Sequence, residues 1–509
     1  MSPKLLNIRH IELSNIKNIF IFFFVISLVF SRFFADAFVV IAAILLIYQI
    51  IKKNLKIHSI IISSLLIFYI YLIINSLFSE VVLESIKSTL PYARFILFTL
   101  FFLIYFSDKY SLKIILYSFF FIYIILFIDG IFQINSGFNL FGYPLEISGR
   151  ASSFFGRHLI LGSFVSKTFA IVVFLIFYLN IKHKYIFYLS SVFVTALLVY
   201  ISRERSSLLF YLMILFFSFF SIEKKYFFKI ILIVIFKLLL LTIFYQKPLE
   251  RLYIHTKSQL FSESKNLIIF SDRHELHYIT AYRIFKNFSI FGGGANSFRY
   301  LCDKEPYSTN DLIKNDIKNS VYSKDDGYVY HLKKIDSVKH ENFIFLFFFK
   351  KEFFEKNNIS IYNSDKIFEL LEKKDATEFY YYRFEPSTLL APIKYNNFDF
   401  VKKDSLLFMS YEFQNGCNTH PHHLFIQILA ETGIVGFVFL LIFYLFIVKC
   451  LFVRLFEFIS IGKNSKDLII YAYYFSFFFP FMPAGNFFNN YYSILLYLPL
   501  TFIILCQRK

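Results

Sequence analysis

Charged residues are scarce in this sequence of 509 residues, and their scarcity excludes an ordinary soluble protein. Asp, Glu, Lys and Arg together make up 17% of the chain, whereas hydrophobic residues make up 57%. A soluble protein of this length needs a mostly polar surface, and about a quarter of its residues are charged. The chain is therefore predicted to be an integral membrane protein.

Tryptophan is absent, although the chain has 75 phenylalanines and 37 tyrosines. Phe, Ile, Lys and Asn are all in excess, which is typical of an AT-rich coding sequence, so the aromatic residues alone indicate no ligand. Residues 1–17 also lack the pattern of a removable signal peptide, which is a short apolar core followed by a small-residue cleavage site. The first apolar segment is therefore predicted to stay in place as a membrane helix.

No single polar domain gathers the basic residues that give the chain its formal net charge of +18. Lys and Arg instead lie in short clusters between apolar segments, such as Lys52 with Lys53 and Lys224 with Lys225. This pattern argues against a nucleic-acid partner, and it fits the rule that cytoplasmic loops are rich in Lys and Arg. The clusters place both termini on the cytoplasmic side.

Apolar windows of about 17 to 22 residues predict an all-α polytopic membrane protein with about 12 transmembrane helices. No internal repeat is evident. The predicted spans lie near residues 18–33, 36–51, 58–78, 89–107, 112–130, 158–179, 185–201, 205–222, 227–245, 423–449, 467–482 and 491–506.

A large mixed extracytoplasmic loop domain is predicted between helices 9 and 10. Residues 1–245 would hold helices 1–9, residues 246–422 the loop domain, and residues 423–509 helices 10–12. Loops longer than about 15 residues are uncommon unless they are functional, so this segment is interpreted as a domain. Within it, Phe343 to Phe349 is apolar but too short to span a bilayer, which leaves a buried strand or an interfacial helix.

The topology separates the four cysteines into two pairs. Cys450 and Cys506 lie near predicted cytoplasmic helix ends, where thiols stay reduced, while Cys302 and Cys417 lie in the predicted extracytoplasmic domain. We predict a disulfide between Cys302 and Cys417, which would stabilise the domain by about 4 to 5 kcal/mol in the chain-entropy model. Two free buried thiols are the alternative.

Arginines on the predicted outer face are exceptions to the positive-inside rule. A guanidinium group binds phosphate in a fork geometry and stays charged, so an anionic lipid headgroup or a lipid pyrophosphate is the expected partner. Simple anchoring to bulk phospholipid is the alternative for each. These arginines are Arg150, Arg157, Arg203, Arg205, Arg273, Arg283 and Arg299.

The segment Thr419 to Gly436 reads THPHHLFIQILAETGIVG and stands where the long polar stretch gives way to an apolar run. An ionisable group in hydrocarbon costs about 2.5 kcal/mol or more, so histidines and Glu431 here indicate a functional site. Thr419 is expected to cap the helix and Pro421 to occupy its first turn. The positive end of the helix dipole would then face outward and favour an anion.

Side chains at helical spacing extend this segment into the membrane. His423, Gln427 and Glu431 would share one helix face, and Gly433 and Gly436 would admit a close helix neighbour. The histidines supply a proton acceptor at neutral pH. A zinc site is the less favoured alternative, because His420, His422 and His423 are closely spaced and lack a nearby fourth ligand.

The string HPHHLFIQILAETGIVG closely resembles the signature of the O-antigen ligase and O-antigen polymerase superfamily. Three further segments are similar to the family. SRERSSLL at Ser202 to Leu209 resembles its serine-arginine turn, with Arg205 in the arginine position. Asp272 to Phe298 resembles the segment that begins at an arginine and ends in a glycine pair and a phenylalanine, and Gly149 to Ser163 resembles a loop of polymerase-like members.

This resemblance implies a metal-independent glycosyltransferase that needs no cofactor and moves an oligosaccharide from an undecaprenyl-pyrophosphate carrier to a hydroxyl acceptor. It implies His422 as the general base, and Arg205 with Arg273 as the residues that bind the pyrophosphate and stabilise it as leaving group. The further residues expected to bind substrate are Arg150, Arg283, Arg299, His420, His423, Gln427 and Glu431.

Two departures from the family pattern leave roles open. His423 stands where the family usually has asparagine, so the base is one of His420, His422 and His423, and His158 stands where relatives tend to have an acid. Arg283 and Arg299 are alternatives to Arg273.

The resemblance also implies the place and the partners of the protein. The site would lie on the periplasmic face of the bacterial inner membrane. The expected partners are the lipid-linked oligosaccharide, membrane lipids, a chain-length regulator, and an acceptor that is a glycan for a polymerase or the lipid A core for a ligase. A transporter or flippase for the lipid-linked glycan is the alternative from another class. A structural membrane scaffold is the third.

Overall fold

The computed structural model describes residues 3–53, 60–146, 149–244, 252–253, 272–309, 321–323, 328–334, 343–350, 382–385, 388–392, 406–412, 416–462 and 464–507. Within these residues, eight helices are long and apolar enough to cross a membrane, and three more apolar helices are shorter. Several of the long helices expose large apolar side chains, among them Phe33 (75% exposed) and Ile51 (76%). The protein is therefore a multi-pass, helical membrane protein.

The first part of the bundle consists of consecutive helices joined by short connections. Some of their ends are fixed by local capping, as at Asp108, whose carboxylate accepts hydrogen bonds from the Tyr110 and Ser111 backbone N–H groups. The helices are α1 (Pro3–Phe30), α2 (Arg32–Lys53), α3 (Ile60–Leu77), α4 (Val82–Thr89), α5 (Ala93–Tyr105), α6 (Lys109–Ser136), α7 (Leu161–Leu179), α8 (Lys184–Ser202), α9 (Arg205–Phe219) and α10 (Lys224–Phe244).

The last part of the chain returns to the bundle with α18 (Leu424–Ile461), α19 (Leu468–Phe477), α20 (Asn490–Tyr497) and α21 (Leu500–Gln507). Each predicted span coincides with one or two of the helices in the structure. The span predicted at 423–449 continues to Ile461, and its helical conformation is interrupted at Gly433. Helix α7 lies at the centre of the bundle and packs against α6, α8, α9 and α19. In its most apolar stretch of 18 residues, 83% of the residues are buried.

The helices α13 and α14 and a β-sheet lie between α10 and α18 in the sequence. Helix α13 (Asp272–Asn287) packs against α18 and is followed by the short α14 (Phe298–Leu301). A six-stranded sheet has the order β1-β2-β3-β7-β5-β6, and its pairs are antiparallel except for β5 with β7. The strands are β1 (Val321–Ser323), β2 (Tyr328–Lys334), β3 (Phe343–Lys350), β5 (Tyr382–Glu385), β6 (Thr388–Pro392) and β7 (Leu406–Glu412).

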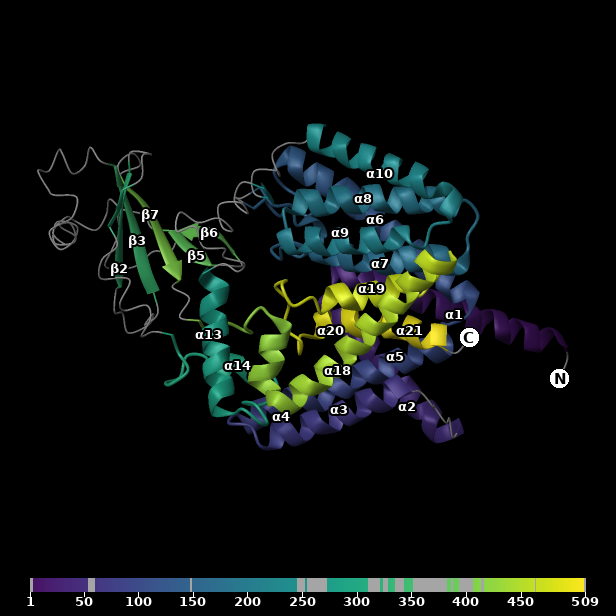
Figure 1. The fold of residues 1–509 in the computed structure, drawn as a ribbon, viewed down its shortest axis with the longest axis horizontal. Helices are drawn as coiled ribbons and strands as arrows, with labels where there is room; N and C mark the ends of the chain where they lie inside the picture. The colour runs from purple at the N-terminus through teal and green to yellow at the C-terminus, as the bar shows by residue number, and fades with distance from the viewer. Residues whose placement is uncertain are drawn as a thin grey trace, which may run out of the picture.

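Of the two alternatives for Phe343 to Phe349, the structure has the strand, which is β3 between β2 and β7. Figure 1 shows α13 and the sheet at one end of the helix bundle, with α1 beginning and α21 ending near the other end. We call the first of these the α13 end. The histidine segment enters α18 there, next to α13.

Candidate functional site

The helix that follows the histidines is broken where the predicted motif places its glycine. Gly433 has φ +64°, a left-handed conformation that residues with a Cβ rarely adopt. The break frees the last carbonyl groups of the first helical segment, which need new donors. Gly293 and Gly294 supply them, because their N–H groups donate to the carbonyls of Ala430 and Glu431, each at 2.9 Å.

The same loop satisfies the helix beyond the break. The Ile434 N–H donates to the Ser289 carbonyl at 2.9 Å, and the Val435 N–H donates to the Ile290 carbonyl at 3.4 Å. The two backbones approach so closely that a Cβ on Gly292 would collide with the backbone at the break. The three-glycine run and the LAETG motif are therefore two halves of one backbone arrangement.

Gln427 and Glu431 form a buried polar network beneath the histidines, and both are 0% exposed. The Glu431 carboxylate accepts hydrogen bonds from the Phe298 N–H (3.0 Å) and the Gln427 amide (2.9 Å). Gln427 also donates to the Asn486 side chain at 2.7 Å and accepts from the Phe487 N–H at 3.0 Å. Both predicted residues do share a helix face, and their hydrogen bonds hold two loops against α18.

His423 caps this helix, and both of its ring nitrogens are occupied. Nδ1 accepts a hydrogen bond from the Ile426 N–H at 3.3 Å, while Nε2 donates to the Pro480 carbonyl at 2.7 Å. The ring is buried (6% exposed). Because both nitrogens are bonded to backbone groups, His423 has a structural role in positioning the segment.

The prediction that Thr419 caps the helix and Pro421 lies in its first turn is wrong. The first helical residue is Leu424, and His423 is the N-cap with an extended backbone. The reason is His422, whose φ of +57° turns the chain out of the helical path. The histidines consequently fold back over the helix end in a compact turn.

His420 and His422 lie side by side in this turn, with ring centroids 4.1 Å apart and the ring planes tilted by 47°. His420 Nε2 donates to the Ala484 carbonyl at 3.2 Å, and its Nδ1 accepts from the Thr419 hydroxyl at 2.9 Å. His422 Nε2 instead pairs with the side-chain amide of Asn418 at 3.2 Å. His422 is thus held by a single side chain, which a substrate hydroxyl is able to replace.

Helix α13 adds two histidines that the sequence interpretation did not select. The ring centroids of His274 and His277 lie 5.5 and 5.3 Å from that of His422. We call these two residues, with His420 and His422, the histidine cluster. Their spacing of three residues on a helix, directly after Arg273 in the family-like segment, was the available signal.

Burial keeps His420 and His422 without a proton at neutral pH. Burial, with the charges of His277, Arg299 and His274, lowers the pKa of His420 to about 4, although the Ala484 carbonyl opposes the shift. Burial and the other three imidazoles lower the pKa of His422 further. His422 is therefore a neutral proton acceptor at pH 7, and its lowered pKa makes it a weaker base than a free imidazole.

The predicted arginines divide between this region and others. Arg299 donates to Asn296 at 3.2 Å, and Asn296 also accepts a hydrogen bond from Asn486, so Arg299 is joined to the network beneath the histidines. Arg283 in α13 donates to the Ser308 carbonyl. Arg273 belongs to the first turn of α13, but its side chain lies outside the described residues.

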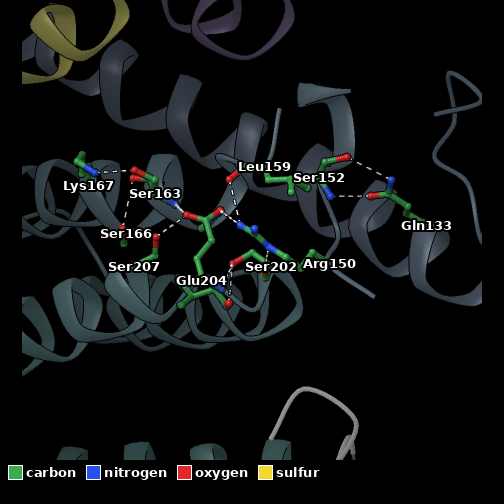
Figure 2. A network of polar contacts seen from close by, with 12 residues as sticks. Gln133, Arg150, Ser152, Leu159, Ser163, Ser166, Lys167, Ser202, Glu204 and Ser207 are labelled. Atoms are coloured by element: carbon green, nitrogen blue, oxygen red, sulfur yellow. Dashed lines mark hydrogen bonds and ion pairs between the residues drawn. The ribbon is translucent and has the colours of Figure 1, made fainter. Parts of the chain in front are cut away.

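Arg150 belongs to a second polar network, at the beginnings of α7 and α9 (Figure 2). Arg150 donates to the Ser202 carbonyl at 3.2 Å and to the Leu159 carbonyl at 3.3 Å, and it lies 3.8 Å from the Glu204 carboxylate. Arg205 is the first residue of α9 and is exposed. The contacts of Arg150 tie the loop before α7 to the turn before α9.

A disulfide joins Cys302 and Cys417, as predicted, with a sequence separation of 115 residues. It links the end of α14 to the start of the histidine segment, and thereby holds the glycine loop beside α18. Within the part of the chain that the structure describes, no group of three or more His, Cys, Asp or Glu side chains is arranged to hold a metal ion.

Comparison with known proteins adds nothing to this geometry, because no protein-family model, no curated protein and no solved structure matches the chain.

Proposed function

We propose that the protein is a glycosyltransferase that moves an oligosaccharide from undecaprenyl pyrophosphate to a hydroxyl acceptor in surface polysaccharide synthesis, without a metal or a cofactor. In this proposal all twelve predicted helices cross the bacterial inner membrane, both termini are cytoplasmic, and the α13 end is periplasmic. The observation that carries the proposal is His422, a neutral imidazole in a turn at the mouth of a membrane helix, with Arg299 connected to the same network.

In the proposed reaction, each of these residues has one role. His422 accepts the proton of the acceptor hydroxyl as its oxygen bonds to the anomeric carbon of the sugar. The bond from that carbon to the phosphate oxygen breaks, and the pyrophosphate leaves with the electron pair. Arg205 and Arg273, with Arg299 nearby, would stabilise this leaving anion by charge and bidentate hydrogen bonds. Gln427, Glu431 and His423 hold the base in place.

An apolar cavity supports a lipid-linked substrate. It has a volume of about 400 Å³ and lies between α3, α18 and the last helices of the chain. Ile428 and Phe487, which line it, are neighbours of the buried Gln427 in the network beneath the histidines. A hydrocarbon chain in this cavity would lead directly to the polar groups at the α13 end. The remaining lining residues include Ser64, Phe68, Phe439, Phe443 and Tyr497.

One observation favours the alternative, a transporter or flippase for the lipid-linked glycan. The break in α18 at Gly433 resembles the discontinuous helices that line transporter substrate sites. In this chain, however, backbone groups of the Ser289 to Gly294 loop occupy the freed hydrogen-bonding groups at the break. The break therefore serves the fold, and the transferase remains the better supported function.

Two experiments test the proposal and its acceptor. Substitution of His422 or Arg205 by alanine should abolish glycan transfer in membranes while the protein remains inserted, and wild-type transfer by both variants would refute the proposal. A deletion strain separates the two acceptors. Lipid A that carries one repeat unit identifies a polymerase, whereas carrier-linked polymer that never reaches lipid A identifies a ligase.

A further inference from the structure

Lys167 places an ammonium group inside the helix bundle, in the second turn of α7. Its Nζ donates to the Ser163 hydroxyl, one turn earlier, at 2.6 Å. Helix α7 is the most deeply buried of the long apolar helices in the described part of the chain. A charged side chain within a membrane helix is costly, so this lysine calls for a compensating charge or a function.

The nearest carboxylate, Glu204, is already committed to other groups. Figure 2 shows Glu204 between Ser163 and Arg150. It accepts hydrogen bonds from the N–H groups of Gly162 and Ser163, both at 3.1 Å, and from the Ser207 hydroxyl at 2.7 Å. Its ion pair is with Arg150, and within the described residues Lys167 forms none. The one carboxylate therefore interacts with two cations, Arg150 and Lys167, and also caps α7, so one negative charge is shared between two positive ones.

Two aromatic rings hold the ammonium without neutralising it. Lys167 Nζ lies 5.4 Å from the ring centroid of Phe210 in α9 and 5.8 Å from that of Tyr492 in α20. A cation over a ring face gains about 0.5 to 2 kcal/mol but keeps its full charge. The positive charge of Lys167 is thus available to an anion that enters between these helices.

The Tyr492 ring also connects Lys167 with the histidine cluster. A Cβ on Gly485 would lie 2.8 Å from this ring, so the ring packs directly on the chain at Gly485. The preceding residue, Ala484, accepts the His420 hydrogen bond and donates to the His422 carbonyl at 2.8 Å. Lys167 therefore lies one loop away from the base, on the side of the arginine turn before α9.

We propose that Lys167 is a binding residue for the phosphate groups of a lipid pyrophosphate, where its ammonium exchanges the Ser163 hydroxyl for a phosphate oxygen. This inference rests on the proposed function for the identity of the ligand. An ammonium in a site shielded from water forms strong, charge-assisted hydrogen bonds with phosphate, and it would share the anion with the arginines of the neighbouring turn.

The test is binding of farnesyl pyrophosphate, a soluble lipid pyrophosphate, to the purified protein in detergent. Lys167→Met keeps the length of the side chain and removes its charge, and the affinity should fall about 10- to 100-fold, as expected for loss of one hydrogen bond to a charged group. Farnesol, which lacks the phosphates, should bind both proteins equally. Binding of inorganic pyrophosphate, compared with that of farnesyl pyrophosphate, shows whether the phosphates alone are enough for binding or the lipid chain is also needed.

Matched variants exclude indirect effects. Lys184→Met removes a half-buried lysine that pairs with Glu223 at 2.9 Å, and Ser163→Ala removes the resting partner of Lys167. Both variants should bind within about threefold of wild type. If methionine at position 167 prevents folding, Lys167→Gln provides the same comparison. Unchanged affinity in a folded Lys167 variant, or equal losses for farnesol and its pyrophosphate, would overturn the inference.

The outcome also separates this inference from the proposed function. Binding that depends on Lys167, in a protein that transfers no glycan, would support the phosphate site and refute the transferase. Glycan transfer that is unaffected by Lys167→Met would support the transferase and refute the phosphate site at Lys167.

Discussion

The same substitution at two adjacent histidines should slow glycan transfer strongly at one position and hardly at the other. His422→Asn removes the predicted base, but it suits the backbone, because asparagine tolerates the left-handed region that His422 occupies at φ +57°. His423→Asn keeps a good N-cap, because an asparagine side chain is also able to accept the Ile426 hydrogen bond. The pair thus tests the role of the base with little change in the fold of the segment.

The expected magnitudes differ by orders of magnitude. General base catalysis by a positioned side chain contributes about 10²- to 10⁴-fold, so His422→Asn should slow transfer by that factor. His423→Asn loses the hydrogen bond to Pro480, which costs about 1 kcal/mol of stability, and transfer should stay within about fivefold of wild type. The assay is the rate of transfer at saturating carrier, beside thermal melting in the same detergent.

Two results would contradict this reasoning. Near-normal transfer by His422→Asn would exclude His422 as the base. A large loss in His423→Asn, with melting unchanged, would move the role to His423 and make the backbone contacts of its two nitrogens irrelevant to its function.

Three further predictions concern stability. The pKa of His420 is lowered to about 4 in the folded state from about 6.5 in the unfolded chain, so the unfolded state binds more protons and the melting temperature should fall as pH drops from 6.5 to 4. His420→Gln should show a weaker dependence of the melting temperature on pH, and a dependence equal to that of the wild type would count against a buried neutral histidine. Mass spectrometry without reductant should find Cys302 and Cys417 unavailable to alkylation, and reduction should cost up to about 4 to 5 kcal/mol; two alkylated thiols would refute the disulfide. Gly433→Ala should destabilise more than Gly137→Ala, because both glycines have positive φ but only at Gly433 would the new Cβ meet the backbone of Ile290; equal losses would refute that packing.

Hydrophobicity predicted the parts of the fold that depend on composition. Apolar runs located the helices because a bilayer requires long apolar segments. The disulfide between Cys302 and Cys417 was predictable because both cysteines lie in the predicted extracytoplasmic domain, where thiols oxidise. The number of spanning helices was harder to predict, because α9 and α19 are short and, among the described residues, eight helices have the length and hydropathy needed to span. An apolar segment of the sequence is longer than the regular helix it forms wherever part of that segment folds back into the bundle as a loop.

The candidate site was predicted less completely, because its positions depend on tertiary contacts. Gly433 was interpreted as a place for a neighbouring helix, whereas the neighbour is a loop backbone that completes a broken helix. The local pattern suggested Thr419 as the cap, but the left-handed turn at His422 overrides that preference. His274 and Lys167 were missed, since only folding brings α13 over the histidine turn and α7 beside α20.

The fate of the lipid carrier tests the central claim most directly. Purified protein in liposomes would be incubated with undecaprenyl-pyrophosphate oligosaccharide and an acceptor glycan, and the carrier would then be analysed by mass spectrometry. A transferase releases one sugar-free undecaprenyl pyrophosphate for each glycosidic bond formed, and His422→Asn should suppress both products together. A carrier that keeps its oligosaccharide and merely changes sides of the bilayer would contradict the account.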